Sequence, residues 1–131
     1  MTLLRELDHW VILLRPAQVT LGSLVLAAKS DATAYGAVPG EAFAEQAEAV
    51  ALIERALAGF CAYERINYLM RMMVDPNVHF HVFPRYSEPR RWKGVDFPDL
   101  GWPGPPQLSG ASALSTEQIV ALVAHLTDNF R

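Results

Sequence analysis

The sequence has few of the features that mark a specialised class of protein. Its single cysteine, Cys61, cannot form a disulfide within the chain, which fits the reducing cytoplasm. No run approaches about 18 uncharged apolar residues, so we expect no membrane-spanning helix. The first ten residues lack the basic region and apolar run of a signal peptide. These absences predict a cytoplasmic protein without a membrane partner.

Strong charge of one sign is also missing. The net charge is -3 at pH 7 and the isoelectric point is near 5.7, whereas a nucleic-acid-binding protein needs a basic surface. We therefore expect no nucleic-acid partner, although a small phosphorylated ligand is compatible with this charge. A composition of 51% hydrophobic and 19% charged residues is typical of a globular protein, and 131 residues fit a single domain, 1–131.

Common motifs of nucleotide and nucleophile chemistry are absent as well. The chain has no G-x-x-x-x-G-K-[ST] phosphate loop, no G-x-G-x-x-G motif, no G-x-S-x-G elbow and no C-x-x-C pair. Any phosphate site must therefore come from another arrangement of side chains.

The pattern of apolar residues predicts four or five strands and two helices. Short apolar runs between turn residues are typical of strands, and apolar residues at helical spacing are typical of amphipathic helices. Ser115 and Gln118 form a capping box, and Gly59 marks the expected end of the first helix. Hairpins without strand–helix–strand alternation predict an α+β fold with an antiparallel sheet. The expected strands are His9–Leu14, Ser23–Ala28, Ile66–Met73 and Val78–Arg85, and the expected helices are Glu41–Phe60 and Ser115–Arg131.

A segment rich in proline, glycine and tryptophan, Ser87–Ala113, separates the last strand from the last helix. Its prolines and glycines argue against a regular element. Three large aromatic residues favour an ordered arm that wraps over the body of the protein, because a disordered tail would carry fewer of them. These residues are Trp92, Phe97 and Trp102.

The stretch N-V-H-F-H-V-F-P-R-Y, residues 77–86, carries the main indication of function. Side chains alternate between the two faces of a strand, and those of one face are about 6.5–7 Å apart. Val78, Phe80 and Val82 are therefore expected to face the core. The opposite face then presents three nitrogen-bearing side chains in a row, Asn77, His79 and His81.

Such a row suits attack on phosphorus. Neutral imidazole, with an ordinary pKa near about 6.5, is a nucleophile and a general base at neutral pH. His79 would attack while His81 donates hydrogen bonds to the phosphoryl oxygens.

Two other interpretations of the histidines stay open at this point. They could be ordinary surface residues, or they could supply two ligands to zinc, which needs a third. Candidates for that third ligand are Asp75, Glu88, Cys61 and His9, and none has a diagnostic spacing.

Two further groups of residues have plain structural explanations. A basic run is compatible with phosphate binding, but it is more often a solvated loop; here it comprises Arg85, Arg90, Arg91 and Lys93. Flexible methionines usually fill gaps in a core or on a sheet face, which we expect of Met70, Met72 and Met73.

The 77–86 stretch resembles the signature of the histidine triad (HIT) family of nucleotidyl hydrolases and transferases. That signature is His-φ-His-φ-His-φ-φ, where φ is apolar, often followed by Pro-Arg. His79 matches the middle histidine and His81 matches the last. Leu14–Leu26 is similar to the hairpin before the family's long helix, and Glu64–Met73 to the strand beside the motif. The resemblance covers His9 to Tyr86.

This resemblance implies a five-stranded antiparallel sheet with two helices, usually paired into a homodimer, and no metal or other cofactor. It also implies a hydrolase of nucleoside phosphate conjugates, such as dinucleoside polyphosphates or nucleoside phosphoramidates. In that chemistry His79 attacks the α-phosphate, a nucleotidyl-histidine intermediate forms, and water releases the nucleoside monophosphate. His81 is the hydrogen-bonding partner.

Three positions depart from the family pattern. Asn77 replaces the first histidine, and its amide still donates and accepts hydrogen bonds. Met73 stands where many members carry a polar Asn or Gln, and Arg15 where others hold an acidic or amide residue against the ribose. A non-catalytic nucleotide-binding module is therefore the alternative function. The candidate nucleotide or phosphate contacts are Arg15, Gln18, Met73 and Arg85.

Overall fold

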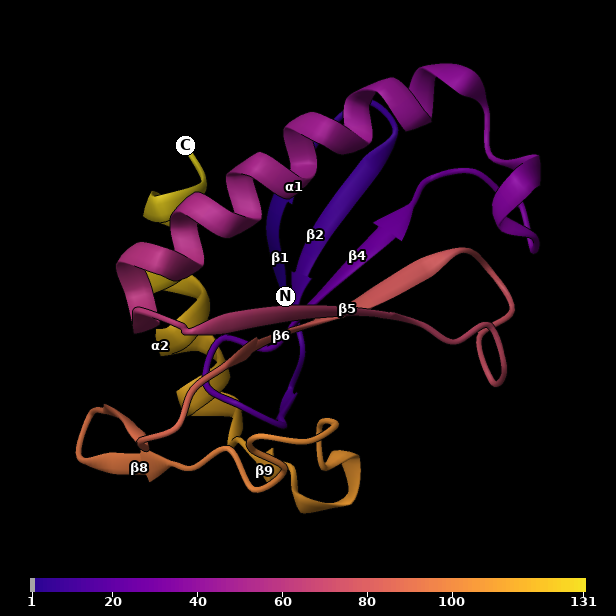
Figure 1. The fold of residues 1–131 in the computed structure, drawn as a ribbon. Coiled ribbons are helices and arrows are strands. Elements are labelled where there is room, and N and C mark those ends of the chain that lie inside the picture. Colours follow the sequence, from indigo (N-terminus) through magenta and orange to yellow (C-terminus); the bar gives the residue numbers. More distant parts are fainter. Residues whose placement is uncertain (1) are drawn as a thin grey trace.

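A five-stranded antiparallel sheet forms the centre of the computed structural model, which describes residues 2–131 (Figure 1). The order of the strands is β1-β2-β4-β6-β5, so β6 lies between β4 and β5 and the two edges are β1 and β5. Together with two helices this arrangement confirms the predicted α+β fold. The strands are β1 (Leu3–Glu6), β2 (Trp10–Leu14), β4 (Leu24–Ala28), β5 (Arg65–Met70) and β6 (His79–Arg85).

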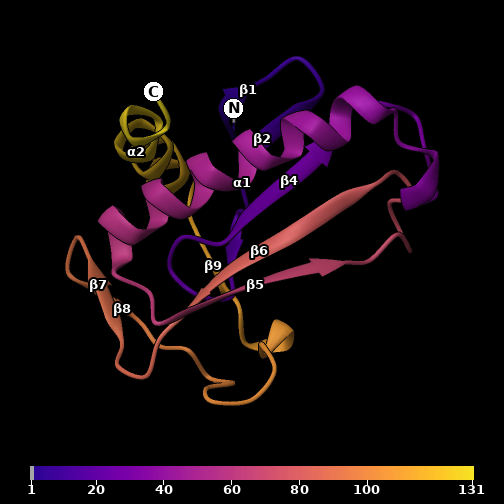
Figure 2. The same ribbon diagram turned by 45° about the horizontal axis from the view of Figure 1, so that its top comes forward.

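The long helix α1 (Gly40–Cys61) crosses one face of the sheet (Figure 2). Its buried residues include Ile53 and Leu57, which belong to one apolar cluster with Trp10 and Leu24 of the strands. The indole Nε1 of Trp10 also donates to the Ala42 carbonyl at 2.7 Å. Burial of this apolar surface is the main force that holds helix and sheet together.

The end of α1 differs from the prediction. The helix passes through Gly59 and ends at Cys61, because the next residue, Ala62, adopts a left-handed conformation with φ 48°. The guanidinium of Arg90 donates to the carbonyls of Cys61 and Ala62 at 2.6 and 2.9 Å, which satisfies groups that a helix end leaves free.

The second helix, α2 (Thr116–Thr127), begins as predicted. Ser115 Oγ accepts a hydrogen bond from the main-chain N–H of Gln118 at 3.1 Å. The side-chain oxygen of Gln118 accepts from the main-chain N–H of Ser115 at 2.9 Å. A 3₁₀ turn, Asp128–Phe130, follows the helix, and its Phe130 is fully buried. The helix packs against β1 and the turn packs against α1.

The proline-rich arm is more regular than its composition suggests. It contains a hairpin, β7 (Arg90–Trp92) with β8 (Val95–Phe97), and a short strand β9 (Ser112–Ala113) paired with β3 (Ala17–Gln18). The expectation of no regular element was wrong, because prolines and glycines occupy the connections and leave short strands between them. The arm is nevertheless ordered on the body, as predicted, with Phe97 2% exposed. Two 3₁₀ turns complete the structure, Tyr35–Ala37 and Leu108–Gly110.

Several strand boundaries also differ. The prediction had no strand at Leu3–Glu6, and it carried the third strand to Met73, whereas β5 ends at Met70. Met73 is 78% exposed, so its expected packing was wrong. Within residues 2–131, neither helix combines the length and apolar character needed to cross a membrane.

Candidate functional site

Strand β6 divides its side chains between the core and the opposite face of the sheet. Val82 is fully buried in the cluster beneath α1, and Phe80 packs against that cluster. His79 and His81 lie on the other face, opposite Ala27 and Val25 of β4 in the register. The predicted alternation is therefore confirmed for the strand residues, and Val78, just before the strand, is also buried in the core.

The two imidazoles lie close together. Their ring centroids are 5.1 Å apart with an interplanar angle of 79°, and His81 stacks on the fully buried Phe83 at 6.2 Å and 7°. His79 is 7% exposed. The central position of β6 and the rigid phenyl ring beneath His81 hold both imidazoles without the need for a loop to close.

The main chain at Asn77 determines which nitrogen of His79 is available. His79 Nδ1 lies 2.7 Å from the Asn77 carbonyl oxygen. A carbonyl only accepts, so Nδ1 carries the proton and Nε2 keeps its lone pair. Asn77 therefore supports His79 through its backbone, while its side chain is exposed. Asp75 Oδ1 accepts a hydrogen bond from the main-chain N–H of Asn77 at 3.1 Å and stabilises this turn.

Arg15 gives His81 the opposite tautomer. Arg15 Nε donates to His81 Nδ1 at 3.4 Å, so this nitrogen is the acceptor and Nε2 carries the proton. Burial, the positive charge of Arg15 and the neighbouring His79 and Arg71 lower the pKa of His81 to about 4. At pH 7 His81 is therefore neutral and carries its proton on Nε2, whereas the neutral tautomer of His79 that the Asn77 carbonyl favours has its lone pair on Nε2.

Arg15 is itself held in place. Its Nη1 donates to the Ala17 carbonyl at 2.6 Å, and its guanidinium lies 5.7 Å from the Phe83 ring centroid. Burial and the nearby charge of Arg71 lower the pKa of Arg15. The predicted candidate Arg15 is therefore part of the site.

A pocket of about 260 Å³ opens in front of the imidazoles. Met73, a predicted candidate, forms part of its wall, and its neighbour Val74 is fully exposed at the rim. The lining residues are Arg71, Met73, Val74, Asp75, His79 and His81.

Two other candidates do not reach this pocket. The Gln18 side chain is 1% exposed, donates to the carbonyls of Arg15 and Ser23, and accepts from the amides of Gly22 and Ser23. It fixes the turn before β4. Gly22 of that turn has φ 97°, a conformation that favours glycine.

Arg85 is committed to the arm. It is 4% exposed, binds both carboxylate oxygens of Asp99 at 2.7 and 3.0 Å, and also donates to Asn67 and to the Gly104 carbonyl. Its charge is therefore neutralised within the protein. Its neighbours in the basic run are engaged as well, since Arg91 pairs with Asp96 on the surface.

Sequence reasoning missed Arg71 and Phe83. Arg71 directly follows β5, the strand that pairs with β6. The predicted hairpin was the signal that could have found it, because residues beyond the end of one strand lie near the start of its partner. Phe83 shares the face of His81 two residues further along, as the same alternation requires.

The metal interpretation lacks its third ligand. Among residues 2–131 no group of three or more His, Cys, Asp or Glu side chains is arranged to hold an ion. Cys61 is buried and directs its thiol at the Leu57 carbonyl, and burial raises its pKa to about 11. Asp75 lines the pocket but forms no such group with the two imidazoles.

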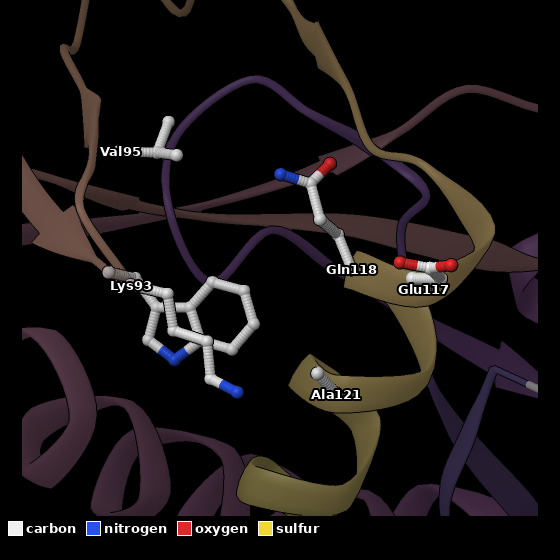
Figure 3. Close-up of a pocket in the computed structure, with 6 residues that line it drawn as sticks. Lys93, Val95, Glu117, Gln118 and Ala121 are labelled. Carbon is white, nitrogen blue, oxygen red and sulfur yellow. The ribbon is translucent and has the colours of Figure 1, made fainter.

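A second pocket, of about 350 Å³, lies between the β7–β8 hairpin and the first turns of α2 (Figure 3). The Lys93 ammonium lies 5.4 Å from the Trp92 ring centroid on one side, and Glu117, Gln118 and Ala121 line the other. The Gln118 oxygen is already used by the capping box. This pocket has no imidazole or thiol, so we place the candidate site at β6.

The chain is an α+β sheet protein with two adjacent imidazoles on the face of the central strand β6 that lies opposite the α1 core. No family model matches the sequence, and no curated protein matches it. Solved structures do match. A histidine triad protein from Bradyrhizobium japonicum has a TM-score of 0.76 at 16% identity, covering 98% of this chain and 89% of that one.

Two further structures agree. A HIT protein from Sinorhizobium meliloti has a TM-score of 0.75 at 20% identity, covering 97% of this chain and 87% of its own. A protein from Sulfolobus tokodaii described as a hypothetical histidine triad nucleotide-binding protein has a TM-score of 0.72 at 17% identity, covering 98% and 83%. The chain therefore has the histidine triad fold, which confirms the fold that the resemblance implied.

Proposed function

We propose that the protein is a nucleotidyl hydrolase that cleaves a nucleoside phosphate conjugate, either a dinucleoside polyphosphate or a nucleoside phosphoramidate. The observation that carries the proposal is the pair of opposite tautomers, with the free Nε2 of His79 beside the protonated Nε2 of His81. A nucleophile and a hydrogen-bond donor are the two groups that attack on phosphorus needs.

The proposed reaction uses this geometry. His79 Nε2 attacks the α-phosphorus, a nitrogen–phosphorus bond forms, and the bond to the leaving group breaks. The ring then carries a positive charge, and the Asn77 carbonyl stabilises it by accepting from Nδ1–H. His81 Nε2–H donates to a phosphoryl oxygen, where negative charge builds up. Water attacks the nucleotidyl-histidine, releases the nucleoside monophosphate and restores His79.

The replacement of the first histidine by Asn77 is compatible with this mechanism. The contact to His79 comes from the main chain, which any residue at position 77 provides. The exposed amide side chain is not needed to orient the nucleophile.

A non-catalytic nucleotide-binding module is the second candidate function. Met73 favours it, because a thioether in the wall of the pocket is a poor hydrogen-bonding partner for a phosphate or a leaving group. Such a module would bind a mononucleotide and release no product.

The test compares variants on a panel of adenosine and guanosine dinucleoside polyphosphates and phosphoramidates, with release of nucleoside monophosphate read by chromatography. We expect His79→Ala to lower turnover by at least about 10³-fold, as for loss of a nucleophile. Asn77→Ala should lower it by less than about tenfold, because the carbonyl stays.

His125→Ala is the matched control, since His125 is exposed on α2 and outside the pocket. Turnover by His79→Ala equal to that of the wild type would exclude the mechanism. Binding of a mononucleotide without turnover by the wild type would favour the module.

We also propose a homodimer, formed through α1 and the free edge of β5. The carboxylate of Glu54 accepts from the Tyr68 hydroxyl at 2.7 Å and ties this side of α1 to the edge strand. Exposed alanines follow the same side of the helix and would let a second helix approach closely; they are Ala44, Ala47, Ala51 and Ala58. A cytoplasmic location and independence of cofactors and nucleic acids stay predictions.

A further inference from the structure

Two guanidinium groups lie near His81 without a negative partner: Arg71 lines the pocket, and Arg15 donates to His81 Nδ1. None of the ion pairs found within residues 2–131 includes Arg15 or Arg71. Both groups are close enough to His81 to disfavour its protonation, and Arg71 acts in the same way on Arg15. Guanidinium groups stay charged at neutral pH, so the two groups attract an anion that enters the pocket.

The acidic residue of the pocket does not relieve this charge. Asp75 lines the pocket but uses Oδ1 for the Asn77 amide, on the side of His79. It is within ion-pair distance of neither guanidinium. A phosphoryl group under attack brings negative charge of its own, and a second anionic group joined to it would add charge for Arg71 in the pocket lining and Arg15 beside His81 to stabilise.

The protonation of His81 gives a second, separate argument about the leaving group. An amine that leaves phosphorus must take up a proton, and a general acid has to supply it. Arg15 donates to His81 Nδ1, so His81 is held neutral and has no proton that it readily gives up. Of the other lining side chains, Asp75 accepts from the main-chain amide of Asn77 through Oδ1, and a guanidinium such as that of Arg71 is too weak an acid for this role. A phosphate or sulfate leaves as an anion without protonation.

We propose that Arg15 and Arg71 select substrates whose leaving group is itself an anion, so that the enzyme cleaves a phosphoanhydride-type bond and not an amine-linked one. The inference rests on the proposed function and names its substrate class. In the first step the bond from phosphorus to the bridging oxygen breaks, the bond from His79 Nε2 forms, and the oxygen keeps the electron pair. Arg15 and Arg71 stabilise the charge on the departing group.

The test measures kcat/KM of the full chain for a diadenosine polyphosphate and for adenosine 5′-phosphoramidate, and for the guanosine counterparts. We expect the anhydride to be preferred by roughly 10- to 100-fold, the effect of a charge-assisted hydrogen bond. Arg71→Met should lower kcat/KM for the anhydride and leave the phosphoramidate nearly unchanged.

Arg15→Met provides a sharper readout. It removes a positive charge and the hydrogen bond to His81 Nδ1, so His81 accepts a proton more easily. We expect anhydride cleavage to fall and phosphoramidate cleavage to rise, whereas a merely structural role would lower both. Arg91→Met is the control, because Arg91 pairs with Asp96 on the β7–β8 hairpin outside the pocket.

The outcomes separate this inference from the function on which it rests. Efficient phosphoramidate cleavage by the wild type, or an equal loss on both substrates in the two variants, overturns the selection of an anionic leaving group and leaves the hydrolase intact. Failure of the wild type to cleave any member of the panel overturns both.

Discussion

The partners of His79 and His81, two residues apart in the chain, favour different tautomers of the two rings. The Asn77 carbonyl keeps a proton on Nδ1 of His79, and Arg15 keeps one on Nε2 of His81. The alternation of side chains along β6 does not predict either partner. The partner of His79 is a main-chain oxygen, and Arg15 lies in the connection between β2 and β3. At this scale the chemistry is decided by which nitrogen is occupied.

The titration of His81 is the first prediction at the scale of the residue. Its pKa is lowered to about 4 by burial, by the charge of Arg15 and by the neighbouring His79 and Arg71. Titration of the imidazole signals by NMR should show a midpoint well below the ordinary value of about 6.5. Arg15→Met should move this midpoint upward, because one of the positive charges is gone.

The same shift affects stability. Between pH 6.5 and about 4 the unfolded chain binds more protons at His81 than the folded chain does. This contribution to the free energy of unfolding is therefore complete above pH 6.5 and is lost as the pH falls through 4. Urea unfolding of His81→Gln should depend less on pH in this window than unfolding of the wild type, with His125→Gln as the control. A midpoint near 6.5 for His81 would contradict both expectations.

At the scale of the element, a buried ion pair attaches the arm to the sheet. The side chains of Arg85 and Asp99 are 4% and 1% exposed, and Tyr86 adds a hydroxyl that donates to the Phe97 carbonyl at 2.8 Å. These contacts explain why a segment rich in proline and glycine is ordered on the body. They also explain why Arg85 is not available to a phosphate.

Breaking this pair should be costly. Asp99→Asn leaves the Arg85 charge buried without its partner, and we expect the free energy of unfolding to fall by about 3–5 kcal/mol in urea titrations. Asp96→Asn, which breaks the exposed pair with Arg91, is the matched control and should change it by less than about 1 kcal/mol. Equal effects of the two substitutions would show that the arm is held by its apolar contacts alone.

At the scale of the whole molecule, the free edge of β5 and the exposed alanines of α1 bear on assembly. An unpaired edge strand invites pairing with another chain, and a second copy of this chain carries the same surface. We therefore expect light scattering at micromolar concentration to give twice the chain mass of 14.5 kDa.

A charged side chain on the alanine side of α1 should disrupt this assembly. Ala51→Arg places a long cation on the proposed interface and should shift the mass toward that of the monomer. Ala124→Arg, at an exposed position of α2, should not. A monomeric mass for the wild type would exclude the homodimer.

Much of the fold could be predicted from the sequence because it depends on local patterns. The alternation at residues 78–82, the capping box at Ser115 and the helical periodicity of α1 all correspond to observed elements. Boundaries were less predictable. Gly59 fits a helix end by composition, but the helix continues, and the Arg90 guanidinium reaches its last carbonyls from a distant hairpin.

The sequence by itself determined which side chains of β6 share the face opposite the core, since a period of two along a strand is a property of the backbone. Only the tertiary structure decided which candidates lie there. The three polar or charged candidates near strands differ in their partners. Gln18 and Arg85 use their hydrogen-bonding groups on other parts of the protein, whereas Arg15 contacts His81. A hydrogen bond joins groups that are distant in the chain, so its partners are settled only when the sheet, the helices and the arm pack together.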